Sequence, residues 1–297
     1  MYLINLKYYL LTQYSILRER LIDFVGVWIG HSDTSAKNAQ TELVEPLTSR
    51  IDNIFNIHYQ HYKKAIVVTP TTGSACLKDA LESVSNQGYK NLDHLVVIDG
   101  AGFEEDSKCI LNQFKSEHIK IMTLPFNTGS HGFNGHRIYA AASYLINSDY
   151  VFFLDQDNWY DENHVGSLVD LMETENLDWA YSLRKIYKES TEFVVNDNCE
   201  SLGSYPSYSR RPNLVDTNCY ALRRRILTQV AQAWYHPLQA DRHFFQQISS
   251  KFPNFKTTSQ YSVNYRLTAN RPPTPEFFLQ GNQFMLKKYN GNLPWLA

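Results

Sequence analysis

The chain has 297 residues, 43% of them hydrophobic and 14% aromatic, which allows a sizeable core and excludes disorder over the whole chain. Its 28 basic and 30 acidic residues give a formal net charge of −2, so we expect no nucleic-acid partner, which would need a basic field. Four widely separated cysteines, without C-x-x-C or zinc spacing, predict reduced thiols, mostly packed inside a cytoplasmic protein.

Residues 1–62 are predicted to form an N-terminal helical extension with a linker. Apolar spacing indicates one or two helices over 2–29, a polar linker over 31–47 and a further helix over 48–62. A secretory signal pattern is missing, and the most apolar early stretch is about half the ~20 residues of a membrane span. We expect residues 1–30 to dock on the main domain, with a partner protein or the inner face of a membrane as alternatives.

Strands and helices are predicted to alternate from residue 65 to residue 154. Short β-branched runs beside turn residues predict the strands, and helical periodicity predicts the helices between them. In chain order they are a strand over 65–70, a helix over 77–87, a strand over 94–100, a helix over 106–117, a strand over 120–124, a helix over 137–146 and a strand over 150–154. This order is typical of an α/β fold with a mostly parallel sheet covered by helices.

Ligands of such sheets bind beyond the carboxyl ends of the strands, so the residues that follow each strand are the site candidates. They are Thr69, Pro70, Thr71, Asp99, Asn127, Asp155, Gln156 and Asp157. Two carboxylates one residue apart suit Mn²⁺ or Mg²⁺, which prefer oxygen ligands and keep substrate phosphates in their shell. Asp155 and Asp157 are therefore the predicted metal ligands, although acidic pairs also occur in turns and helix caps.

Five segments keep the order and spacing of one known family. They are the strand and turn over 66–70, the helix over 77–87, the strand over 95–100, the acidic motif over 153–160 and the segment over 240–245. In these segments the chain resembles the family 2 glycosyltransferases. The resemblance implies a GT-A fold over 63–297, in which 63–160 bind the nucleotide and 161–297 form the acceptor and catalytic half with a C-terminal loop.

The resemblance also implies how the first half binds a nucleotide-sugar donor. Thr69 and Thr71 would flank the base and ribose, and Asp99 would accept a hydrogen bond from the base, as suits the N–H of uracil. Asp155 would lie near the ribose or the donor sugar, and Asp157 would bind the metal directly. A UDP-sugar is the favoured donor.

In the second half, the resemblance implies that Asp241 is the general base that takes the proton of the acceptor hydroxyl. A covalent glycosyl-enzyme would need a second carboxylate as nucleophile, which the resemblance does not supply, so we predict inversion. The Q-x-x-R-W motif of processive synthases is missing, which favours the addition of a single sugar. The acceptor is expected to be a glycan or another hydroxyl compound.

Two positions depart from the family pattern. The usual Arg-Asn pair before the metal motif is replaced by the segment 133–137, and we expect His136 or Arg137 to face the donor instead. The acidic residue that often precedes the base is Ala240 here.

Further candidates lie near the end of the chain. Asp216 and Asn218 are predicted to contact the donor sugar or the acceptor. Residues 264–273 are predicted to form a loop beyond the last strand, which would bring Arg266 near the pyrophosphate.

Other interpretations of the same residues are open. Asp99 would otherwise be a turn residue, and Asp241 a helix N-cap. A nucleotidyltransferase that makes nucleotide-sugars shares the layout and the acidic site, but it normally has a basic, glycine-rich loop after the first strand, which 69–76 lack. A non-catalytic binding protein that has kept the fold is the third alternative.

Overall fold

The computed structural model describes residues 63–189, 192–236, 239–268 and 272–297. The helices and linker predicted over 1–62, and the contacts predicted for residues 1–30, lie outside this part of the chain. Within it, no helix is long and apolar enough to cross a bilayer. Two of the four cysteines, Cys199 and Cys219, are buried, whereas Cys109 is exposed.

The first half alternates strands and helices as the sequence predicts. The elements are β1 Ala65–Thr71, α3 Leu77–Ser85, β2 Leu92–Ile98, α4 Glu104–Leu111, β3 Ile119–Thr123, α5 His136–Leu145 and β4 Tyr150–Phe153. All neighbouring strands in the order β3-β2-β1-β4 are parallel. The helix predicted over 106–117 begins two residues earlier and ends at Leu111, because the N–H groups of Gln113 and Phe114 bond to the carbonyl oxygens three residues before them and tighten the last turn.

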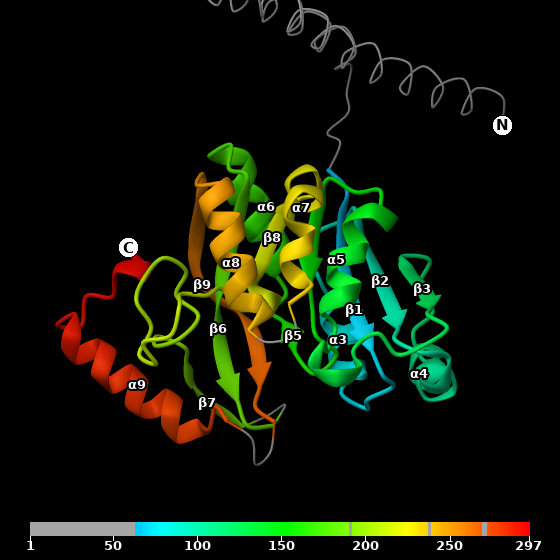
Figure 1. Ribbon diagram of the computed structural model, residues 1–297, viewed down its shortest axis with the longest axis horizontal. Coiled ribbons are helices and arrows are strands. Elements are labelled where there is room, and N and C mark those ends of the chain that lie inside the picture. Colours follow the sequence, from blue (N-terminus) through cyan, green and yellow to red (C-terminus); the bar gives the residue numbers. More distant parts are fainter. Residues whose placement is uncertain (1–62, 190–191, 237–238, 269–271) are drawn as a thin grey trace, which may run out of the picture. The chain divides into compact units, whose positions relative to one another are not determined.

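The second half extends the same sheet with mixed pairing. Its strands are β5 Trp159–Tyr160, β6 Trp179–Tyr187, β7 Phe193–Asn196, β8 Tyr220–Arg223 and β9 Phe255–Arg266. Its helices are α6 His164–Thr174, α7 Arg224–Val230, α8 Ala240–Lys251 and α9 Pro275–Lys288. The order runs β3-β2-β1-β4-β8-β6-β9-β5, with β7 beside β6 (Figure 1). β8 is antiparallel to both neighbours, whereas β6 and β9 are parallel, so the α/β prediction is confirmed with a mixed second half.

Short 3-10 helices connect several of these elements. They are η1 Ala101–Phe103, η2 Ser130–Gly132, η3 Thr217–Cys219, η4 Ala231–Trp234 and η5 Pro294–Leu296.

Helices cover both faces of the parallel half because its strands are apolar on both sides. Along β2, Leu95 and Val97 point toward α5, whereas Val96 and Ile98 belong to a separate apolar cluster with residues of α3 and α4. This alternation follows from the two-residue period of a strand. It explains why β2 reads in the sequence as a continuous apolar run.

Aromatic side chains join α5, η4 and α8 into one layer, and α5, α7 and α8 lie side by side across a face of the sheet (Figure 1). Trp234 stacks on Phe244 at 4.3 Å between ring centroids and meets Phe153 edge-on at 5.5 Å. All three rings are fully buried. Each such side chain contributes about 1.5–3 kcal/mol of burial free energy, so this layer holds the start of α8 firmly against β4.

Candidate active site

A cavity of about 360 Å³ opens at the carboxyl ends of β1, β2 and β4, in the size range of small-molecule sites. Its wall is lined by Pro70, Thr71, Thr72, Asp99, Asn127, Gly129, Asn134, Gly135, His136, Asp155, Gln156, Asp157, Asn158, Thr217 and Tyr265. Residues predicted from four different strand ends therefore meet in one place, as expected for an open α/β sheet.

Gln156 fixes the loop that follows β1. Its Oε1 accepts hydrogen bonds from Thr71 Oγ1 at 2.7 Å, from the backbone N–H of Thr72 at 3.1 Å and from that of Ser74 at 3.3 Å. Its Nε2 donates to Thr72 Oγ1 at 3.2 Å. Gln156 thus contributes to the wall and also shapes the loop opposite it.

Asp99 is buried and organises the loop at the far side of the cavity. One carboxylate oxygen accepts from the backbone N–H and the hydroxyl of Thr128, both at 2.7 Å, and the other accepts from the N–H of Gly129 at 2.8 Å. Asp99 thus holds the backbone of a loop, which agrees with the alternative of a structural residue, and it also lines the cavity. Beside it, Asn127 Oδ1 is buried without a protein hydrogen-bond partner among the described residues.

Asp155 is held by two neutral donors. Tyr139 donates its hydroxyl proton to Oδ1 at 2.6 Å, and Asn218 Nδ2 donates to Oδ2 at 3.0 Å. Asn218 Oδ1 also accepts from the Asp155 backbone N–H at 2.6 Å. Burial, followed by the charge of Asp157, raises the pKa of Asp155 to about 7, against the lowering effect of these hydrogen bonds.

Asp157 also faces the cavity, and burial raises its pKa, while the Arg266 guanidinium counteracts that rise. No ion pair within 4 Å joins its carboxylate to another side chain in the described ranges. Asp155 and Asp157 are partly buried, and burial disfavours the charged form of both carboxylates. A divalent cation bound between them would offset this cost. The described residues contain no group of three or more His, Cys, Asp or Glu side chains placed to share one ion. A cation held here would complete its shell with water and phosphate oxygens, which is usual for Mg²⁺.

The sequence matches the family described as Glycosyl transferase family 2 over residues 66–230, which is more than half of the chain. The chain belongs to this family. The matched range runs from the second residue of β1 to the end of α7 and includes the pair Asp155 and Asp157, whereas Asp241 and Arg266 lie beyond it.

The GT-A fold of this glycosyltransferase is supported by solved structures. S. aureus TarS 1–349 superposes with a TM-score of 0.53 at 15% identity, over 78% of this chain and 67% of that chain. Its complex with UDP-GlcNAc gives 0.54 at 14% identity, over 78% and 68%. Full-length S. aureus TarS gives 0.51, and 41% of that chain is covered. At such identities the likeness concerns the fold alone.

A curated relative matches a short part of this chain. An uncharacterized protein of Haemophilus influenzae is 35% identical over 57 residues, which are 19% of this chain and 38% of the relative. The match therefore spans well under half of that relative's length.

His136 and Arg137 point to different places. His136 lines the cavity and stacks on Trp234 at 5.9 Å, whereas Arg137 donates to the Thr128 carbonyl oxygen at 3.2 Å and lies over the Phe133 ring. Burial lowers the pKa of His136, and the negative charge of Asp241 counteracts that effect. Of the two predicted residues, His136 lines this cavity and Arg137 does not, and contact with a donor stays a prediction.

Asp241 lies in the first turn of α8, close enough to His136 for its charge to be felt there. The N-cap of α8 is Gln239, so the N-cap interpretation of Asp241 is wrong. The reason is that the helix already begins at Ala240, which is buried in the core. Asp241 is not part of the cavity wall itself, and its role as base stays a prediction.

Three other predicted contacts are occupied within the protein. Thr69 is buried two residues before the end of β1 and hydrogen-bonds His94 Nε2 at 2.8 Å. Asp216 pairs with Arg184, and Asn218 holds Asp155. None of the three is among the residues that line the cavity, and direct contact with a sugar or base stays a prediction for them.

The loop predicted over 264–273 is wrong at its start, because residues up to Arg266 belong to a strand. The last strand, β9, continues to Arg266, whose backbone N–H donates to Asn158 Oδ1 at 2.9 Å. Its guanidinium forms an ion pair with Asp79 of α3 and lies over the Trp159 ring. The predicted loop therefore starts three residues too early, because pairing with β5 and β6 keeps 264–266 extended.

Sequence reasoning did not find several residues that shape the site. Tyr139 supports Asp155 from the buried face of α5, and Asn134 and Tyr265 line the cavity. Tyr139 has no local signal that distinguishes it from an ordinary core tyrosine. Tyr265 falls in the segment that was expected to be a loop.

Proposed function

We propose that this family 2 glycosyltransferase moves a single sugar from a UDP-sugar to an acceptor hydroxyl, with metal dependence and inversion of the anomeric centre. The observation that carries the proposal is the meeting of Asp99, Asn127, Asp155 and Asp157 in one cavity at the strand ends. Support also comes from the TarS structures of the same fold, which are described as complexes with UDP and with UDP-GlcNAc.

The nucleotide would lie across the wall formed by the loop after β1 and the loop after β3. Asn127 Oδ1 is a buried acceptor without a partner among the described residues, which suits a base N–H. The Asp99 carboxylate accepts three hydrogen bonds already and retains capacity for one more. We infer that both residues contact the base, and that Thr71 and Gln156 border the ribose.

Asp157 would hold Mn²⁺ or Mg²⁺, with Asp155 beside it as second ligand. When bound, such an ion offsets the negative charge that builds on the leaving diphosphate. Arg266, whose charge reaches Asp157, would lie near the same phosphates.

Asp241 would act as general base. Its carboxylate takes the proton of the acceptor hydroxyl as the oxygen attacks the anomeric carbon. The bond from that carbon to the diphosphate oxygen breaks, and the nucleoside diphosphate leaves from the opposite face. One displacement therefore inverts the anomeric centre. The acceptor is a glycan or another hydroxyl compound.

The test is thermal unfolding with UDP, GDP or dTDP, each with and without Mn²⁺, followed by UDP release from a panel of UDP-sugars. A ligand that binds only the folded state raises the melting temperature, so we expect a shift with UDP that needs the metal. Asp157→Ala should lose the metal-dependent part of that shift. Asp241→Asn should keep the shift and lose transfer. The absence of a shift with every nucleotide would refute the proposal and favour a non-catalytic binding protein.

A further inference from the structure

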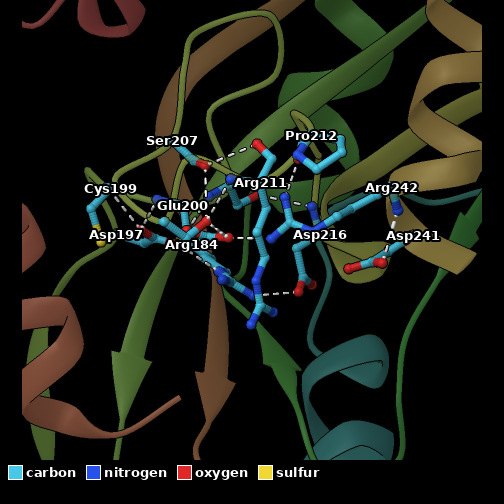
Figure 2. A network of polar contacts seen from close by, with 12 residues as sticks. Arg184, Asp197, Cys199, Glu200, Ser207, Arg211, Pro212, Asp216, Asp241 and Arg242 are labelled. Carbon is cyan, nitrogen blue, oxygen red and sulfur yellow. Dashed lines mark hydrogen bonds and ion pairs between the residues drawn. The ribbon is translucent and has the colours of Figure 1, made fainter. Parts of the chain in front are cut away.

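Two arginines are buried behind the cavity, where charged side chains are rare. Arg184 on β6 is 5% exposed, and Arg242 on α8 is 7% exposed. Figure 2 shows both in one network of polar contacts, with Arg242 reaching from the start of α8 toward Glu200 and Pro212. Neither arginine lines the cavity, so their role has to be sought in what they hold.

Arg184 leads to the acidic pair. Its Nε donates to Asp197 Oδ2 at 2.8 Å, and its terminal nitrogen pairs with Asp216 Oδ2. Asp216 Oδ1 accepts from Asn218 Nδ2 at 2.8 Å and from the Asn218 N–H at 3.0 Å. Since Asn218 holds both the backbone and the carboxylate of Asp155, an unbroken series of hydrogen bonds joins Arg184 to Asp155.

Arg242 leads to the base. Its two terminal nitrogens donate to Glu200 Oε1 and to the Pro212 carbonyl oxygen. The planar guanidinium fixes both directions at once, and Arg242 is the neighbour of Asp241 in the first turn of α8. The Arg242 backbone N–H also donates to Asp241 Oδ1 at 2.8 Å.

Asp197, which pairs with Arg184, also binds the backbone of the turn that carries Glu200. Asp197 accepts from the backbone N–H groups of Cys199 at 3.0 Å, Glu200 at 2.9 Å and Ser201 at 3.2 Å. The turn after β7 is therefore shared between the two arginines.

We propose that Glu200 and Arg242 are positioning residues that fix the Asp241 carboxylate relative to Asp155. The proposal rests on the proposed function, in which Asp241 is the base. A buried ion pair is weak evidence for stability, because well-packed hydrophobic residues of similar volume often replace one without loss, so we ascribe a geometric role to this pair. Here the imposed geometry is the orientation of the first turn of α8.

The variants are Glu200→Gln, Arg242→Gln and the double variant that carries both. Glu175→Gln is the matched control, because it removes an ion pair between Glu175 and Lys256 at the surface. For each we would measure kcat, the KM for the UDP-sugar and the melting temperature. For the single variants we expect kcat to fall about 10- to 100-fold, since a misplacement near 1 Å has effects of that size. The KM for the UDP-sugar should stay within about threefold of the wild-type value, because neither residue lines the cavity.

The double variant separates positioning from stability. It leaves no unpaired buried charge, so its melting temperature should recover relative to the single variants, while kcat stays low. Recovery of kcat together with the melting temperature would overturn the proposal, because the pair would then be purely structural. Crystal structures of wild type and the double variant give a readout that does not need turnover. We expect the Asp241 carboxylate to be displaced in the variant, and an unchanged position would also overturn the proposal. Wild-type turnover and Asp241→Asn test the proposed function separately.

Discussion

Asp155 is expected to make the folded state less stable as the pH rises. Its pKa is raised from 3.8 to about 7, first by burial and then by the charge of Asp157. Between these values the native state holds a proton that the unfolded chain has released, so the free energy of unfolding falls with increasing pH. A shift of about three pH units corresponds to about 4 kcal/mol, of which about 3 kcal/mol is lost between pH 5 and pH 8.

Asp155→Asn removes this titration. The amide oxygen still accepts from the Tyr139 hydroxyl, but the new NH₂ group faces the NH₂ of Asn218, which costs about 1 kcal/mol. The wild-type chain has already lost about 1 kcal/mol at pH 5, which offsets this cost, so we expect the variant to be about as stable as wild type at pH 5 and about 3 kcal/mol more stable at pH 8 in the absence of divalent cations.

The assay is urea unfolding with a chelator at pH 5 and pH 8, followed by circular dichroism. Asp170→Asn, at an exposed position of α6, is the control for the loss of a carboxylate. Carboxylates with lowered pKa, such as Asp93 and Glu173, contribute the opposite pH dependence in every variant, so only the difference from wild type is informative. An equal dependence on pH in wild type and Asp155→Asn would refute the reasoning.

Two further predictions concern the loops of the cavity. Gly129→Ala should destabilise the chain by about 1–3 kcal/mol and weaken UDP binding, because a Cβ there would lie 2.2 Å from the Asn134 carbonyl oxygen. Gly102→Ala is the control, since a Cβ at Gly102 would have nothing within 4 Å. Equal melting temperatures of the two variants would contradict the argument. Gln156→Ala should raise the Kd for UDP about tenfold, since three donors lose their acceptor. Isothermal titration of UDP into the variant checks this, with Gln113→Ala at an exposed position as the control. An unchanged affinity would show that the loop keeps its conformation without Gln156.

The parallel half of the fold is predictable because its signals are local. Each buried strand is a short apolar run, and each helix between them has its own periodicity. The rule that ligands bind at strand ends then brings Asp99, Asn127 and Asp157 together without any knowledge of packing. The structure confirms that these residues line one cavity.

Depth within a strand explains why Thr69 differs from Thr71. The two residues are on the same side of β1, since they are two apart. Only the last residue of the strand reaches the edge of the sheet, where Thr71 meets Gln156. Thr69 lies further in and is covered by β2, so its hydroxyl bonds His94. Its predicted place beside the base required an exact strand boundary, which a sequence does not provide.

The supports of the acidic pair were not predictable, because their partners are distant in the sequence. Asn218 follows Asp155 by 63 positions, and it reaches the acidic motif only because β8 pairs with β4. Tyr139 reaches Asp155 from a helix on the face of the sheet. Neither contact has a local pattern, since tertiary packing alone brings the groups together.

Ala240 illustrates how this packing can replace a family feature. The family often places an acidic residue there, but Ala240 is 1% exposed and faces the core, where an unpaired carboxylate would be costly. Glu200 brings a carboxylate to the same helical turn from another loop, already paired with Arg242. Arg242 is two residues further along α8, on a different side of the helix. If Asp241 is the base, as we propose, this pair would hold the first turn of α8 in place of the acid that usually precedes the base in the family.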